Sequence, residues 1–290
     1  MEIVYHLGAH GTDKDRLLRA LLQNRDELWR EKVEIPAPNR YRGVFGEAMN
    51  ALGGGQASAE MQEVLLDSIL DGDRAERLVL SQPGFLGMPL RAISAQGLYA
   101  NAGDRVMALA NLFPDSTVEF FLAIKHPASL IMSVIEASGR SYDELMAGTM
   151  PGTLRWAPMV RRVLQAAQGR RVVVWCNEDT PLIWPEILRR IADIPAQTRL
   201  SSTGQVLAEI LPPEALRAHQ AELDANPDIT LVERRALTEK VLAEHAIATK
   251  VDIELPLPGW RQDMLDAMTE DYDTDVAQIA ALPGIEFIAP

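Results

Sequence analysis

The chain has 290 residues, of which 47% are hydrophobic and 24% are charged. This composition is that of an ordinary globular protein, and it excludes a disordered or collagen-like chain. The formal net charge of −13 argues against nucleic acid as a partner, because a phosphate backbone would be repelled.

Four short apolar runs predict β-strands that are buried on both faces. They are followed or separated by stretches of helical spacing, as expected for crossover connections that are right-handed. The predicted strands cover residues 3–8, 77–82, 116–125 and 170–176, and the predicted helices cover residues 14–29, 98–113, a segment opening at Pro127, 153–167 and 181–192.

The remaining segments are less regular. Turn residues in 33–43 and 52–58 predict loops that flank a short helix. Residues 204–247 show two helical blocks, and an extended break at 255–260 precedes a last acidic helix. The sequence therefore predicts an α/β fold, a doubly wound and mostly parallel sheet with helices on both faces. We expect one domain over 1–290, with its core in 1–200 and a helical C-terminal extension in 201–290.

The chain also carries signals about its compartment. Cys176 is the single cysteine, which excludes an intramolecular disulfide and suits a reducing cytoplasm. The sequence opens on a strand-like segment without the basic and apolar regions of a secretory signal. No stretch approaches the ~20 apolar residues of a membrane span. We expect a cytoplasmic protein without a membrane partner; its oligomeric state is not predicted.

The first strand-to-helix loop is the first candidate site, because ligands of open α/β sheets bind at the carboxyl ends of strands and anions bind at helix N-termini. Residues 6–17 read HLGAHGTDKDRL, which lacks the spacing of a Walker A loop. The loop resembles that of bacterial sulfotransferase-like proteins of the P-loop-type nucleotide-binding fold. His6, Gly8, His10 and Thr12 match that pattern, as does the following LLQNRDEL.

This resemblance implies a cofactor, 3′-phosphoadenosine 5′-phosphosulfate. Its 5′ end would be held by a set of loop residues, namely Gly8, His10, Gly11, Thr12 and Lys14. A second motif of the family, a cation at a strand end and a serine eight residues later, resembles KHPASLIMS. Here Lys125 stands in place of the family arginine, and Ser133 is in register. These two residues are expected to converge on the 3′-phosphate at the start of the helix that opens at Pro127.

The loop departs from the family pattern at four positions. Gly11 replaces the lysine, Asp13 the central glycine, and Lys14 with Asp15 the two hydroxyl residues. The aspartates bring negative charge close to the expected phosphate. A competing interpretation is that Asp13 caps the helix beginning there and that Asp15 in its first turn favours the helix dipole.

His10 and Lys14 are the candidate catalytic residues. The place of the family's general base, after the second predicted strand, is taken by Ser81, Gln82 and Pro83. His10 and His126 remain as bases with a suitable ordinary pKa, although a structural role is the alternative for both. We expect Lys14 to lie about one turn into the helix, with its side chain leaning back toward the loop.

Two further pairs of polar residues lie at or just after the ends of predicted strands. His6 and His10 lie four residues apart on a strand and its loop, where that spacing does not bring both rings together, so no metal site is predicted. Glu178 and Asp179 follow the strand at 170–176, and they either contact a ligand or cap the next helix.

The resemblance implies sulfuryl transfer to a small-molecule hydroxyl or amine acceptor, and the loop substitutions predict that this activity is impaired or lost. The alternative is a non-catalytic binding or scaffold protein on the same fold, because fold alone does not fix function.

Overall fold

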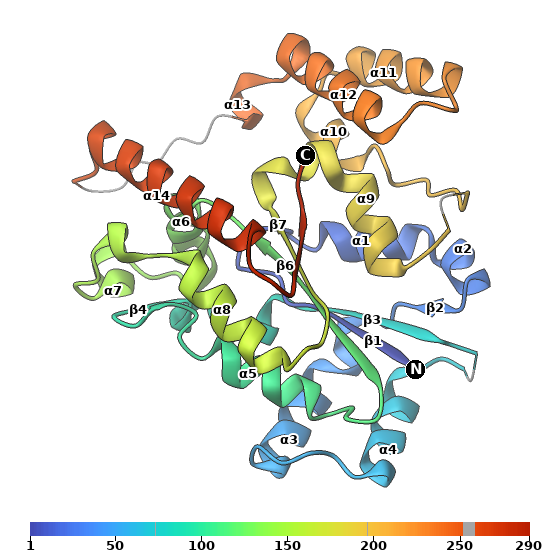
Figure 1. Cartoon of the computed structure of the whole chain (residues 1–290), viewed down its shortest axis with the longest axis vertical. Helices are drawn as coiled ribbons and strands as arrows, with labels where there is room; N and C mark the ends of the chain where they lie inside the picture. The colour runs from blue at the N-terminus through green and yellow to red at the C-terminus, as the bar shows by residue number, and fades with distance from the viewer. Residues whose placement is uncertain (73, 196, 252–258) are drawn as a thin grey trace.

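A computed structural model describes residues 1–72, 74–195, 197–251 and 259–290 (Figure 1). Its centre is a six-stranded sheet in the order β2-β3-β1-β6-β7-β8, in which every neighbouring pair is parallel. The strands are β1 (Glu2–His6), β2 (Val33–Glu34), β3 (Arg77–Ser81), β6 (Thr117–Ile124), β7 (Val172–Cys176) and β8 (Ile285–Ile288). A small antiparallel pair, β4 (Ile93–Ser94) with β5 (Gly97–Leu98), stands apart from it.

The predicted fold class is confirmed. All four predicted strands lie parallel in this one sheet, and their apolar residues are buried on both faces. Two strands of this sheet were not predicted, and neither was the β4–β5 pair. The two-residue β2 lies in the segment expected to be a loop, followed by η1 (Pro38–Arg40), and β8 supplies an edge strand from the far end of the chain.

Helices cover both faces of the sheet, and two apolar clusters form the core. Residues alternate along β1, so that Ile3 and Tyr5 belong to one cluster and Val4 to the other. The first face is covered by α3 (Arg42–Leu52), α4 (Ala59–Ile69), α5 (Ala102–Ala110), α6 (Pro127–Ser138), α8 (Trp156–Ala167) and α14 (Gln262–Ala280). The second is covered by α1 (Arg16–Gln23), α2 (Arg25–Arg30), α9 (Thr180–Ala192) and α10 (Gln205–Ile210).

The helix predicted over 14–29 is interrupted. Asn24 ends α1, and its side-chain amide donates to the Ala20 carbonyl at 2.7 Å and to Ser202 Oγ at 2.7 Å. The short elements between the main ones are α7 (Tyr142–Met146), η2 (Pro83–Leu86), η3 (Pro89–Arg91), η4 (Pro151–Thr153) and η5 (Asn177–Asp179). The helix predicted over 98–113 begins at Ala102, because the residues before it pair in β5.

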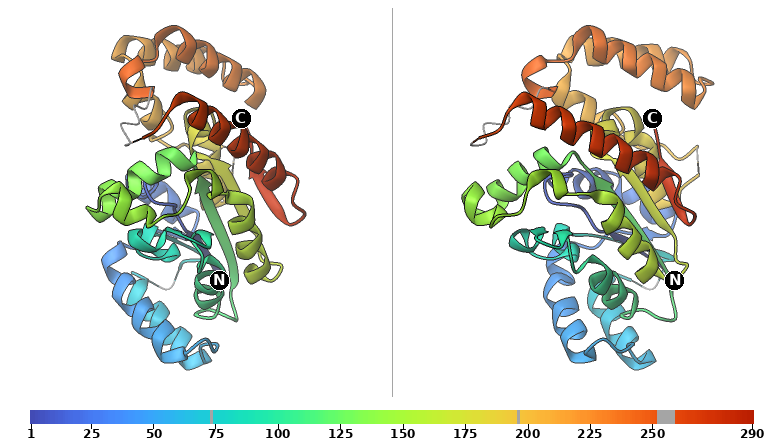
Figure 2. Two further views of the ribbon diagram at one scale, coloured as in Figure 1. Left: turned by 90° about the vertical axis from the view of Figure 1, so that its left-hand side faces the viewer. Right: turned by 60° about the vertical axis from the view of Figure 1, so that its left-hand side comes forward.

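The C-terminal helical region begins with α10 and continues through α11 (Pro213–Ala225), α12 (Leu231–His245) and α13 (Ala248–Val251). Figure 2 shows α11 and α12 at the opposite end of the molecule from α3 and α4. Arg235 of α12 forms an ion pair with Glu186 of α9, which connects the α11–α12 pair to a helix that covers the sheet. Most of the break predicted at 255–260 lies outside the described residues. In the described ranges, no helix is both long and apolar enough to cross a membrane.

Candidate functional site

The candidate site lies where the parallel strands end. β1 ends at His6, level with Ser81 of β3 and Phe121 of β6. The loops that leave these strands therefore meet at one edge of the sheet, as expected for an open α/β fold. Each loop carries residues that the sequence singled out, and the structure shows which of them come together.

The first loop is closed by hydrogen bonds within itself. Thr12 is buried, and its hydroxyl donates to the Ala9 carbonyl at 2.7 Å. Gly8 and Gly11 have φ angles of +53° and +73°, a region that favours glycine. Lys14 and Asp15 also have positive φ angles, 49° and 60°, which costs a non-glycine residue roughly 1–2 kcal/mol. This loop conformation persists only because surrounding contacts fix it.

The expectation for Lys14 is wrong. The residue lies in the loop before α1, not one turn into the helix, because α1 begins only at Arg16. Its side chain is exposed. Arg16 itself pairs with Glu209 of α10 at 2.7 Å.

The Asp13 side chain binds the first turn of α1. Its Oδ1 accepts from the Leu17 backbone N–H at 2.7 Å, and its carbonyl accepts from the Arg16 N–H at 2.9 Å. The Asp13 side chain thus satisfies a first-turn N–H of α1, as the capping interpretation expects, although the N-cap residue itself is Asp15. The expectation that Asp15 lies in the first turn is wrong, because α1 begins only at Arg16. Burial raises the pKa of Asp13, while nearby His6 opposes that shift. A carboxyl group of the chain stands at the helix terminus where an anion would bind.

Lys125 and Ser133 come together as the spacing predicts. The Lys125 ammonium donates to Ser133 Oγ at 3.0 Å and to the Gly11 carbonyl at 3.2 Å. Ser133 donates in turn to the Ser129 carbonyl at 2.9 Å. Lys125 is only 7% exposed, and burial lowers its pKa. These hydrogen bonds fasten the first loop to the start of α6. The role of the pair in holding a phosphate remains a prediction.

Gly11 lies directly against this pair. A Cβ at position 11 would overlap the Ser133 side chain and would lie 3.6 Å from Lys125 Nζ. No side chain fits here without movement of the loop or of α6. The space that a side chain at position 11 would need is therefore filled by Ser133.

The second helix terminus at this edge also has a carboxylate. Glu178 accepts from the His126 backbone N–H at 2.8 Å and from the Tyr272 hydroxyl of α14 at 3.0 Å. His126 caps α6, since its Nδ1 accepts from the Ala128 N–H at 3.2 Å, and its Nε2 lies 3.2 Å from Thr269 Oγ1. The structural interpretation of His126 is supported. Asp179 precedes α9 and makes no side-chain cap.

His10 is held by Tyr99. The Tyr99 hydroxyl oxygen accepts from the His10 backbone N–H and lies 2.9 Å from His10 Nδ1, with the rings stacked 5.8 Å apart. Donation of the phenol proton to Nδ1 gives this buried hydrogen an acceptor, so that Nε2 carries the imidazole proton. Burial lowers the pKa of His10. The imidazole is thus a neutral hydrogen-bond donor rather than a ready base at Nε2.

The His6 ring lies against residues of β3 and β7. Its Nδ1 lies 2.8 Å from Ser81 Oγ, and its ring stacks on Trp175 with centroids 6.0 Å apart. Within the described part of the chain, no three histidine, cysteine or acidic side chains are grouped as metal ligands would be.

Beside the first loop, the structure shows a cleft of about 610 Å³ that the sequence did not predict. Its lining combines His10 and Gln82, both of interest from the sequence, with three arginines from separate elements: Arg42 of α3, Arg91 of η3 and Arg105 of α5. The arginines are far apart in sequence and follow no motif. Only the structure identifies them as part of a site, because it places them beside the first loop.

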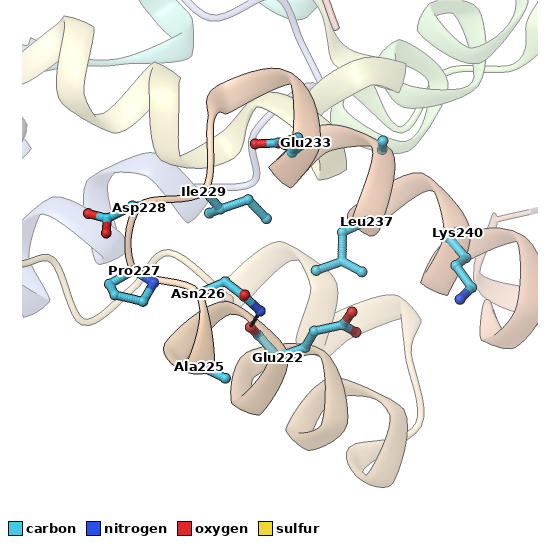
Figure 3. Close-up of a pocket in the computed structure, with 10 residues that line it drawn as sticks. Glu222, Ala225, Asn226, Pro227, Asp228, Ile229, Glu233, Leu237 and Lys240 are labelled. Carbon is cyan, nitrogen blue, oxygen red and sulfur yellow. Dashed lines mark hydrogen bonds between the residues drawn. The ribbon is translucent and has the colours of Figure 1, made fainter.

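A second hollow, of about 760 Å³, lies between α11 and α12, away from the sheet edge (Figure 3). Ile229 and Leu237 give it an apolar floor, with Glu222, Glu233 and Lys240 around them. It shares no residue with the candidate site.

No family model and no curated protein matches this sequence. Among solved structures, the chain is similar to a sulfotransferase from Alicyclobacillus acidocaldarius. The two share 14% identity with a TM-score of 0.42, over 81% of this chain and 95% of that chain. Identity this low says nothing about the chemistry of the present chain.

Proposed function

We propose that this chain is a non-catalytic protein that acts by binding, on an α/β fold of the sulfotransferase-like kind, with its phosphosulfate loop closed by its own residues. The observation that carries the proposal is the 2.7 Å hydrogen bond from the Leu17 N–H to Asp13 Oδ1, which puts a carboxyl group where the loop would hold a phosphate. Glu178 has the same place at the start of α6.

The residues present do not fit 3′-phosphoadenosine 5′-phosphosulfate. A carboxylate about 4 Å from a phosphate costs about 4 kcal/mol per unit charge at an effective dielectric of 20. A helix N-terminus contributes only about 0.3–1 kcal/mol at an exposed site. The repulsion therefore exceeds the attraction at α1. At α6, two donors of the Lys125 ammonium are already used by Gly11 and Ser133.

The groups needed for transfer are also missing from their expected places. Gly11 supplies no cation, and its neighbours leave no room for one. Gln82 has no basic group, and in the tautomer in which His10 Nδ1 accepts from Tyr99, the Nε2 atom carries the proton and has no lone pair for base catalysis. Loss of one preorganised electrostatic partner alone commonly slows a reaction by ~10²- to 10³-fold.

The test is titration calorimetry with adenosine 3′,5′-bisphosphate, together with a sulfuryl-transfer assay on phenols, alcohols and amines. We expect the native chain to show no turnover, and no bisphosphate binding that depends on Lys125. An Asp13→Asn, Glu178→Gln variant keeps both hydrogen-bond acceptors and removes both charges, so it should bind the bisphosphate better than the native chain. An Asp26→Asn, Glu63→Gln variant, changed at exposed sites, is the matched control.

Two results would contradict the proposal. One is saturable bisphosphate binding by the native chain that is weakened by Lys125→Met. The other is native turnover that is abolished by Lys14→Ala. Either would show that the loop opens to a working nucleotide site and that the sulfotransferase interpretation of the sequence is correct.

A further inference from the structure

The cleft beside the first loop concentrates positive charge in an acidic protein. Arg42, Arg91 and Arg105 line it, and none of the described residues in its lining is acidic. Across the described ranges, no ion pair involves any of these three side chains. In a chain with a formal charge of −13, three arginines grouped without carboxylate partners form a local field that attracts anions.

Arg105 is the fixed member of the group. Its Nε donates to the Phe85 carbonyl at 3.1 Å and its Nη2 to the Gly84 carbonyl at 3.4 Å. These bonds orient the guanidinium and leave three of its five N–H donors for a ligand. Burial, and then the neighbouring charge of Arg91, lower the pKa of Arg105. Arg91 is thus close enough to repel Arg105, and a bound anion would relieve that repulsion.

Neutral donors complete the polar lining of the cleft. His10 presents an Nε2–H once Tyr99 has satisfied Nδ1. Asn101 precedes α5 and its side chain makes no capping hydrogen bond, so its amide is available. Gln82 also lines the cleft, and its Oε1 is buried without a hydrogen-bond partner in the described structure. As an acceptor, this atom would take a donor group of a ligand and not one of its anionic oxygens.

Part of the cleft lining is apolar. Leu86, Met88 and Pro89 line the cleft, and Met88 is 67% exposed. A volume of about 610 Å³ lies in the range of small-molecule sites. The cleft therefore combines charged donors with apolar side chains.

We propose that this cleft binds a small organic anion that carries one or two negative charges on a sulfate, phosphate or dicarboxylate group and has an apolar body. Guanidinium groups match such oxyanions by paired N–H donors, and Leu86, Met88 and Pro89 contact the body. The inference rests on the proposed function, in which the chain binds a ligand and does not transfer a sulfuryl group. It names the ligand class and depends on the arginines, not on the closed loop.

The experiment is titration calorimetry of the full chain with phenyl phosphate, phenyl sulfate, succinate, inorganic phosphate and inorganic sulfate. We expect phenyl phosphate or one of the other organic anions to bind more tightly than the inorganic ions. Arg42→Gln and Arg91→Gln should each weaken that binding about tenfold, the effect of losing roughly one charged hydrogen bond. Arg217→Gln, an equal charge change at an exposed position of α11, should leave it unchanged. Added salt should weaken it.

The outcomes separate this inference from the proposed function. If no probe binds the native chain, or if both cleft variants bind as the native chain does, the cleft inference is overturned. If adenosine 3′,5′-bisphosphate displaces the probe, and if Lys125→Met weakens the binding of both the probe and the bisphosphate, the anion binds in the first loop. In that case the cleft inference and the closed-loop proposal both fail. Arg42→Gln and Arg91→Gln lie on the surface, so unfolding transitions like that of the native chain will confirm that they fold.

Discussion

Gly11→Ala tests whether the first loop is closed in solution. Alanine at a φ of +73° costs roughly 1–2 kcal/mol. Its methyl group would also overlap the Ser133 side chain, and overpacking of this kind typically costs ~1–3 kcal/mol. The expected loss of unfolding free energy is therefore about 2–5 kcal/mol, measured by urea denaturation followed by circular dichroism.

Gly53→Ala is the matched control. Gly53 ends α3 with a φ of +53°, and nothing lies within 4 Å of a Cβ added there. It should lose only the backbone part, about 1–2 kcal/mol. Ser133→Gly removes the obstruction, so Gly11→Ala should cost less in that background than in the native chain. Equal losses for Gly11→Ala and Gly53→Ala, without this coupling, would mean that the loop does not lie on α6 and that the closed-loop reasoning is wrong.

Two predictions concern pH and the groups that close the loop. Because burial lowers the pKa of Lys125, the unfolded chain binds more protons than the folded chain between that lowered pKa and the ordinary value of about 10.4. The stability of the native chain relative to Lys125→Met should therefore rise with pH across this window. A difference in unfolding free energy that does not change with pH would contradict this prediction. Because burial raises the pKa of Asp13, the stability of the native chain relative to Asp13→Asn should fall as pH rises from about 3.9 through the raised pKa. Asp13→Ala loses the hydrogen bond to the Leu17 N–H and should be about 1 kcal/mol less stable than Asp13→Asn. Thermal unfolding of the three proteins at several pH values checks both signs.

The strands were predictable because their signal is local. Each predicted strand has a run of apolar residues that is buried on both faces, as parallel strands between helices require. β2 has two residues and β8 has four, too few for periodicity to separate a strand from a loop. β8 is an edge strand whose residues are mostly half-buried, so it also lacks the apolar character of the central strands.

The candidate site was predictable only where it depends on neighbours in sequence. Lys125 and Ser133 are eight residues apart across a strand end and the next helix, and their contact follows from that geometry. The carbonyl that also binds Lys125 belongs to Gly11, 114 residues away. No pattern in the sequence indicates that the loop would lie on Ser133. The same holds for the arginine cleft, whose charged residues come from three elements that only the fold brings together.

The charges at the sheet edge favour one anion site over the other. At the starts of α1 and α6, the N–H of Leu17 donates to Asp13 and the N–H of His126 to Glu178, so an anion that arrives at either donor would have to displace a group of its own sign. In the cleft, Arg42, Arg91 and Arg105 pair with no carboxylate of the described residues, and binding would relieve the repulsion of Arg105 by Arg91. Over a Debye length of about 8 Å at physiological salt, these local charges outweigh the net charge of the chain. An anionic ligand that reaches this edge should therefore settle beside the loop and not within it.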